Sequence, residues 1–421
     1  MPRLLIDLAP LRASAQFRRL WIGSLLSAMG TALTNFALPL QIWDITRSTF
    51  AVGLLAAVQL IPAVTIGLLG GAWADARDRR RLLVLGTLAL SGMSLALVLT
   101  ADAGGGWLWL VYLLAAGRSG LAAVTGPVRR TFLPALFGPE RLAPALALDR
   151  LSFQLMLTAG PAIAGVIVGL PALGLRGCYL IDAASFAGSL YGLRGLPAVS
   201  SLPASESART LRAVGKGLAY VLRHPQVSGA FLADLSATVF ALPLSLFPAI
   251  NAERFAGNPH TLGLFSAAIG VGGLASTLLS GPVVRVRRQA AAMLVAVAVW
   301  GGAFAAFAVV GGLVPTLLAL ALAGAADTIT VVMRGAIVQS SVEERMRGRV
   351  TAVDYVVGLS GGQLGSLESG ALGSLTSPTI SALSGGLATI VAAGLLALLL
   401  PGFRRAPVTP DPADEPGRAP A

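Results

Sequence analysis

Residues 70–81 read GGAWADARDRRR and lie between two long apolar runs. Each run has about 20 residues, the length that a helix needs to cross a bilayer. Four arginines occupy the five positions 77–81, and Asp75 falls at the predicted end of the first of these helices. Basic residues beside an apolar run resist translocation across the membrane. The stretch therefore predicts a short cytoplasmic loop between two membrane-spanning helices.

The overall composition supports this interpretation. The chain is 55% apolar and only 12% charged, and soluble domains typically carry about 25% charged residues. Its net charge of +12 does not indicate nucleic-acid binding, because aromatic residues are 6% and the arginines cluster at the ends of apolar runs. The first 20 residues lack an apolar core with a small-residue cleavage site, so no signal peptide is expected. The sequence predicts an all-α, polytopic membrane protein.

Apolar runs of about 18–25 residues predict twelve transmembrane helices. Their expected spans are 17–41, 49–74, 82–100, 107–128, 146–169, 174–194, 226–250, 261–282, 289–310, 313–335, 351–374 and 379–402. Of the 31 Lys and Arg residues, 27 then fall on one side of the membrane. This bias predicts that both termini face the cytoplasm.

Two stretches of the chain are similar to each other. Residues 34–40 read TNFALPL and residues 238–244 read TVFALPL, and shorter matches follow each of them at nearly the same offset. The repeat predicts two pseudo-symmetric six-helix halves in parallel register. The expected units are an N-terminal half (1–194), a central linker (195–225), a C-terminal half (226–403) and a disordered cytoplasmic tail (404–421). Within the linker, apolar residues at helical spacing indicate either an amphipathic helix on the membrane surface or a solvated linker helix.

The loop at 70–81 resembles the signature between the second and third helices of major facilitator superfamily transporters. Gly71, Asp75, Arg79 and Arg80 match it, whereas Asp78 stands where glycine is usual. The resemblance implies that these four residues form a latch that holds the two halves in one conformational state. Asp75 would act at the positive N-terminal end of the eleventh helix or against a basic partner.

Ionisable residues inside apolar spans carry a large cost and need a reason. Arg118 lies about eleven residues into the fourth span. It is either a cavity-facing cation or half of a structural ion pair, and we expect its acidic partner among Asp327, Asp234 and Glu368, in that order. Asp182 is also buried in a span, but the sixth helix is usually peripheral in this superfamily. Asp354 lies close to Arg349 and is expected to form a salt bridge near the membrane surface.

The superfamily resemblance places the first, fourth, seventh and tenth helices around the transport cavity. The residues expected to bind substrate or carry protons are Asn35, Arg118, Asp234, Asp327, Gln363 and Glu368. Gly160, Pro161 and Gly165 resemble an antiporter motif of the fifth helix, in which small residues let helices approach closely. Cys178, His224 and His260 are interpreted as incidental, and no metal site is expected.

The second half sharpens the resemblance. Residues 234–255, VRVRRQ at 284–289 and the stretch from 343 to 370, with RGRV at 347–350 and QLGSLESG at 363–370, are similar to the enterobactin-exporter branch of the superfamily. This branch implies export of catecholate siderophores, and close relatives are drug or macrolide efflux pumps. The expected function is therefore proton-coupled antiport of a siderophore or amphipathic drug-like molecule across the bacterial inner membrane.

Other functional classes are less well supported by the residues. A major-facilitator importer of a small nutrient remains the main alternative. The chain contains no GxxxxGK[ST] loop for ATP-driven transport, no repeated filter motif of a channel and no cluster of polar groups typical of an enzyme. We expect no cofactor and no nucleic-acid partner. The expected partners are a small-molecule substrate, protons and the lipid bilayer, and the protein is expected to function as a monomer.

Overall fold

The computed structural model describes residues 9–75, 78–132, 136–137, 139–194, 207–278, 286 and 288–405. All regular elements in these ranges are helical. The helices of the N-terminal part are α1 (Ala9–Ala13), α2 (Ala15–Thr46), α3 (Thr49–Asp75), α4 (Arg79–Thr100), η1 (Gly105–Trp107), α5 (Leu108–Arg130), α7 (Pro139–Gly169) and α8 (Gly174–Gly192). Those that follow are α9 (Ser207–Arg223), α10 (Pro225–Phe240), η2 (Leu244–Leu246), α11 (Phe247–Arg254), α12 (Pro259–Leu278), α14 (Gln289–Val309), α15 (Leu313–Ser341), α16 (Glu344–Leu375), α17 (Pro378–Leu399) and α18 (Pro401–Arg405).

Within the described residues, ten helices are long and apolar enough to cross a membrane. They are α2, α3, α4, α5, α7, α10 together with α11, α12, α14, α15 and α17. The other two predicted spans, 174–194 and 351–374, lie on α8 and α16, which are long helices of lower hydropathy. Arg176 and Asp182 lower the hydropathy of α8, and many glycines and serines lower that of α16. The protein is therefore an all-helical, multi-pass membrane protein.

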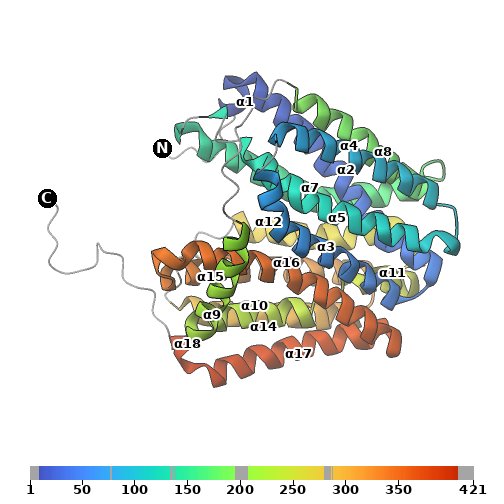
Figure 1. Cartoon of the computed structure of the whole chain (residues 1–421). Coiled ribbons are helices and arrows are strands. Elements are labelled where there is room, and N and C mark those ends of the chain that lie inside the picture. The colour runs from blue at the N-terminus through green and yellow to red at the C-terminus, as the bar shows by residue number, and fades with distance from the viewer. Residues whose placement is uncertain are drawn as a thin grey trace.

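The helices form two groups that meet along two helix pairs (Figure 1). The first group contains α2, α3, α4, α5, α7 and α8, and the second contains α10, α12 and α14–α17. Helix α3 packs on α5 of its own group and on α16 of the other, and α7 of the first group packs on α12 of the second. Helices α1 and α18 lie at the same end of the bundle, at the left of Figure 1.

Glycines make both of these inter-group pairs tight. An ideal Cβ on Gly165 of α7 would lie 2.5 Å from the carbonyl oxygen of Pro259, and one on Gly263 of α12 would lie 2.5 Å from that of Pro161. In the second pair, a Cβ on Gly370 of α16 would lie 2.5 Å from the carbonyl oxygen of Thr49. Any larger side chain at these positions would push the two groups apart.

The seventh predicted span, 226–250, is not one continuous helix. Helix α10 ends at Phe240, and a short irregular segment with η2 precedes α11. Pro243 lies in this break and cannot continue a helical hydrogen-bond ladder. The carbonyl oxygen of Ala241, freed by the break, accepts a hydrogen bond of 2.8 Å from Trp300 Nε1. The equivalent proline of the first repeat, Pro39, lies inside the uninterrupted α2.

Local side chains fix several other helix features. Asp78, which departs from the family signature, caps α4: its Oδ1 accepts hydrogen bonds from the backbone N–H groups of Arg80 at 2.9 Å and Arg81 at 3.2 Å. Helix α9 lies within the predicted linker, residues 195–225. The tail after Arg405 lies outside the described residues.

The single cysteine, Cys178, lies on α8 and is fully buried against α7. Its Sγ is 3.9 Å from the carbonyl oxygen of Ala164.

Candidate functional site

Arg118 of α5 forms a buried ion pair inside the first helix group. Its Nη2 donates to Oδ2 of Asp182 on α8 at 2.7 Å, and the two side chains are 7% and 0% exposed. The expectation that Arg118 pairs with Asp327, Asp234 or Glu368 is therefore wrong. Its partner comes from its own group, because α5 and α8 turn these two side chains toward a common point between α2 and α4.

Two hydroxyl groups complete the environment of Asp182. Thr34 Oγ1 of α2 lies 2.7 Å from Asp182 Oδ2, and Ser94 Oγ of α4 lies 2.8 Å from it. Arg118 Nη1 donates to the same Ser94 hydroxyl. Thus one carboxylate oxygen joins four helices, α2, α4, α5 and α8.

The other oxygen of Asp182 is different. Among the residues that the structure describes, Asp182 Oδ1 has no hydrogen-bond partner although it is buried. It faces α2 at Gly30, where an ideal Cβ would lie 2.7 Å away. Oδ2 of Asp182 therefore accepts three hydrogen bonds, and Oδ1 accepts none from the described residues.

The polar network continues from α8 toward the far end of α2. Tyr179, one turn before Asp182 and fully buried, donates to Gln41 Oε1 at 2.6 Å. Gln41 Nε2 in turn donates to the carbonyl oxygen of Thr100 at 2.9 Å. These bonds satisfy buried polar groups and hold α2, α4 and α8 in one register.

The second helix group contains its own ion cluster, centred on Arg334 of α15. The Arg334 guanidinium bonds Asp234 of α10, and its Nε lies 3.1 Å from Asp354 Oδ1 of α16. Arg334 lies two helical turns before the end of α15 at Ser341, so the helix continues past the predicted end of this span at residue 335. The expected salt bridge of Asp354 is present, but with Arg334 and not with Arg349.

Asp327 adds a third carboxylate to this cluster. It precedes Arg334 by seven residues and therefore lies on the same face of α15. It is half-buried and interacts electrostatically with both Asp234 and Arg334. Within the described part of the chain, its side chain forms no hydrogen bond of its own. Two carboxylates thus contact the guanidinium, and a third, Asp327, interacts with it electrostatically.

The remaining residues predicted to bind substrate do not join either cluster. Asn35 is exposed on α2 next to Thr34, and Gln363 and Glu368 are half-buried on α16. Glu368 follows Asp354 by 14 residues, which is about 21 Å along a helix. Among the described residues, none of these three side chains forms a hydrogen bond or an ion pair.

The predicted latch lies largely outside the description. Gly71 and Asp75 belong to the last turns of α3, whose side chains the structure does not describe. Arg79 is buried at the start of α4, and Arg80 is exposed. The antiporter-like motif is described: Gly160 packs on Ala32 of α2, and Pro161 and Gly165 pack on α12.

Sequence reasoning missed Thr34, Ser94 and Arg334 as members of these clusters. Arg334 carried a detectable signal, since it is a charged residue inside the predicted span 313–335. Thr34 and Ser94 carried none, because threonine and serine are common in membrane helices and usually bond to the preceding turn.

Comparison with known proteins identifies the family of the chain. The sequence profile of the transmembrane secretion effector family matches residues 6–411. The enterobactin exporter EntS of Citrobacter koseri is 28% identical over 371 residues, 86% of each chain, and that of Escherichia coli O1:K1 is equally similar.

Two solved structures show the same fold. The nucleoside transporter NupG superposes with a TM-score of 0.71 at 14% identity, over 93% of this chain and 98% of its own. A bacterial homologue of the iron transporter ferroportin, in an inward-facing state, superposes with a TM-score of 0.70 at 18% identity, over 95% of this chain and 100% of its own. At these identities the likeness concerns the fold alone.

Proposed function

Because the chain belongs to the transmembrane secretion effector family, we propose that it is a secondary exporter that releases a siderophore or another amphipathic small molecule in exchange for protons. The family and the relatives are membrane transporters and not enzymes, which confirms the expected class. The direction of transport and the substrate type are inferred from the relatives named as enterobactin exporters.

The cluster around Arg334 is the observation that supports proton coupling. Asp234 and Asp354 both bond the Arg334 guanidinium, and Asp327 lies close enough to interact with it. Three carboxylates and one guanidinium carry an excess of negative charge in a largely buried place. A proton on one carboxylate relieves this excess, and Asp327, which bonds no described residue, is the carboxylate most free to exchange it.

In this proposal the two helix groups move against each other, so that the substrate site opens to one side of the membrane at a time. The α3–α16 and α7–α12 pairs act as the tight contacts about which the two groups rock, with Asp75, Arg79 and Arg80 as a latch. We further propose that α8 and α16 also span the membrane, which gives twelve spans in two pseudo-symmetric halves. Both termini are then cytoplasmic. The transporter works as a monomer in the bacterial inner membrane.

The main alternative is import of a small nutrient by the same fold. Inside-out membrane vesicles separate the two directions. An exporter accumulates its substrate inside such vesicles when their interior is acidic, whereas an importer of the same molecule does not.

Proton coupling is tested with the Asp327→Asn variant in proteoliposomes. We expect proton movement on addition of a catecholate siderophore or a cationic amphipathic dye to be abolished, because the amide cannot carry the proton. Equilibrium binding of the same compound should survive. Asp44→Asn, at an exposed helix end, is the matched control and should behave as wild type. Wild-type proton exchange by Asp327→Asn would reject Asp327 as the coupling residue.

A further inference from the structure

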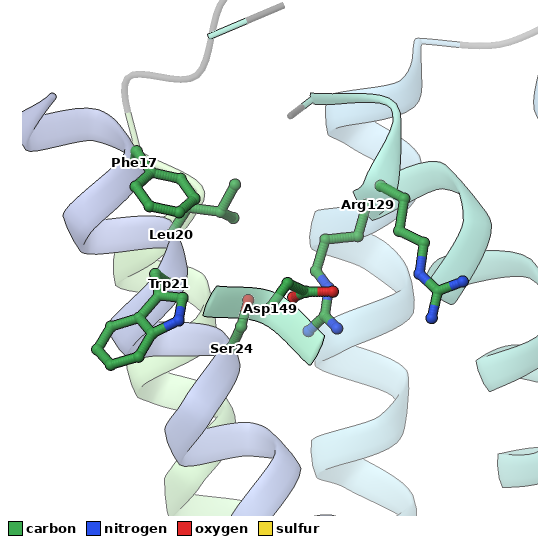
Figure 2. A pocket seen from close by; sticks show the side chains of 7 residues that line it. Phe17, Leu20, Trp21, Ser24, Arg129 and Asp149 are labelled. Carbon is green, nitrogen blue, oxygen red and sulfur yellow. The ribbon is translucent and has the colours of Figure 1, made fainter. Parts of the chain in front are cut away.

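A pocket lies at the end of the first helix group where α2 begins and α5 ends. Its enclosed volume is only about 10 Å³, room for about one water molecule, and it opens into about 280 Å³ when the space open to solvent is included. It is lined by Phe17, Leu20, Trp21, Ser24, Arg129, Arg130 and Asp149. In Figure 2 the Asp149 carboxylate lies between Ser24 and the Arg129 side chain of α5. The pocket is separate from both ion clusters, so neither cluster explains its charged residues.

The charges of this pocket are unbalanced. Arg129 is half-buried and Arg130 is exposed, and among the described residues neither side chain forms an ion pair or a hydrogen bond. The one acid among the described lining residues, Asp149, interacts electrostatically with Arg129 but lies beyond salt-bridge distance. A half-buried guanidinium without a bonded acceptor is unfavourable. An anion in the pocket would supply that acceptor.

Asp149 and Ser24 restrict which anion fits. A carboxylate beside two guanidinium groups accepts hydrogen bonds but repels a second negative group, so it favours a hydroxyl or an N–H next to the acidic group of the ligand. Trp21, half-buried, adds an aromatic wall. The enclosed part of the pocket therefore has room only for the acidic group of such a ligand, with a neighbouring hydrogen-bond donor, and the aromatic or amphipathic remainder would lie in the space open to solvent.

A stripe of accessible small and polar residues leads away from the pocket along α2. Ser24, Ala28, Thr31 and Asn35 follow one another at intervals of four, three and four residues, which places them on one face, and none of them is buried. Ser24 and Asn35 are about 16 Å apart along the helix axis. The exposed apolar residues Ile22 and Leu26 lie on the opposite face of α2, which is the face suited to lipid.

We propose that this pocket is the cytoplasmic capture site for the transported molecule, and that it binds the acidic group of an anionic amphiphile before the molecule moves along α2 toward Asn35. The inference rests on the proposed export function and adds the substrate class to it. An anionic lipid headgroup shares the same charge chemistry. The stripe on the face of α2 opposite Ile22 and Leu26 favours a transported molecule over a lipid.

Binding of a defined probe tests the site directly. Radiolabelled salicylate, an aromatic acid with an adjacent hydroxyl, is measured by equilibrium dialysis against the full chain in neutral detergent without added lipid. We expect Arg129→Gln to weaken binding about tenfold or more, since a charge-assisted hydrogen bond is lost. Arg150→Gln removes an exposed arginine next to Asp149 that does not line the pocket, and it should change binding less than about twofold.

Two analogues test the chemistry of the ligand. Salicylamide, which is neutral, should bind poorly to the wild type. Benzoate, which lacks the hydroxyl, should bind more weakly than salicylate, and Asp149→Asn should remove this preference. Equal losses in Arg129→Gln and Arg150→Gln, or none in either, would overturn the site. Displacement of salicylate by a few phosphatidylglycerol molecules per protein would assign the pocket to lipid and overturn its role in capture.

A transport measurement separates this inference from the proposed function. In inside-out vesicles, Arg129→Gln should raise the KM for an anionic siderophore and leave the maximal rate close to wild type. Unchanged KM with active export would reject the capture site and keep the exporter. Salicylate binding through Arg129 without any export would reject the exporter and reduce the pocket to an anion-binding site.

Discussion

The Oδ2 atom of Asp182 accepts three hydrogen bonds, whereas its Oδ1 atom has no hydrogen-bond partner among the described residues. Arg118, its counter-ion, is almost fully buried. Such a pair adds less stability than its short distance suggests, because both charges have left water. Removing one member is a different matter, because it leaves the other charge buried and unpaired.

A double-mutant cycle on Arg118 and Asp182 measures this difference. Arg118→Gln and Asp182→Asn should each lower the free energy of unfolding by about 3–5 kcal/mol, because each leaves an uncompensated buried charge. The double variant, which buries no charge, should lose clearly less than the sum. Thermal unfolding in detergent gives the comparison. Strictly additive losses would show that the two side chains are not coupled.

Sequence alone identified which residues at this scale are unusual, but not how they pair. Arg118, Asp182 and Asp234 stand out because each is charged inside an apolar span. Their partners depend on how each helix is rotated and which helices are neighbours, and both are set by packing of the whole bundle. The order of acids expected for Arg118 placed its partner in the other half for this reason.

At the scale of the helices, the two groups contact each other through closely packed glycines. Gly165 and Gly263 bring α7 and α12 together, and Gly53 and Gly370 do the same for α3 and α16. Backbone contact without side chains permits tight packing, and it also allows helices to shift against each other at little cost.

Gly165→Ala tests the role of the α7–α12 contact. The added methyl would lie 2.5 Å from the carbonyl oxygen of Pro259, so the helices must separate. We expect export in inside-out vesicles to fall at least about tenfold, since such small misplacements can cost that much. Gly394→Ala on α17, where a Cβ meets nothing within 4 Å, is the matched control and should transport normally. Normal transport by a correctly inserted Gly165→Ala would show that this contact can widen freely.

Helix positions were largely predictable, because hydrophobic length sets them. The break between α10 and α11 was not, although Pro243 lies in it. The same motif around Pro39 is compatible with a continuous helix in α2. The difference is tertiary: Trp300 bonds the carbonyl oxygen of Ala241 at the break. Likewise, Arg334 lies inside α15, where Asp234 and Asp354 balance its charge, and these partners come from other helices.

For the whole molecule, the two helix groups and the common position of α1 and α18 are the main features. Ends that lie on the same side of the bundle require an even number of crossings. The ten apolar helices together with α8 and α16 satisfy this requirement. The excess of arginine at this end predicts that it faces the cytoplasm.

Fusions to a reporter that is active only in the periplasm test this orientation. A fusion after Arg405 should be silent. A fusion near Arg254, the last residue of α11, should be active. Fusion within the region 195–206 should be silent as well. Activity after Arg405 would invert the proposed orientation or change the number of spans.

Cys178 gives the whole molecule a property that spectroscopy can use. It is the chain's single thiol, and it is sealed between α7 and α8 with none of its surface exposed. Maleimide reagents should leave the folded wild-type chain unmodified and react only after denaturation. Pairs of cysteines introduced at the surface of the two helix groups would then carry spin labels without background from Cys178. Pulsed dipolar distances between the labels would test whether the two groups rock as proposed. Rapid labelling of the folded wild type would show that α8 detaches from α7 on its own.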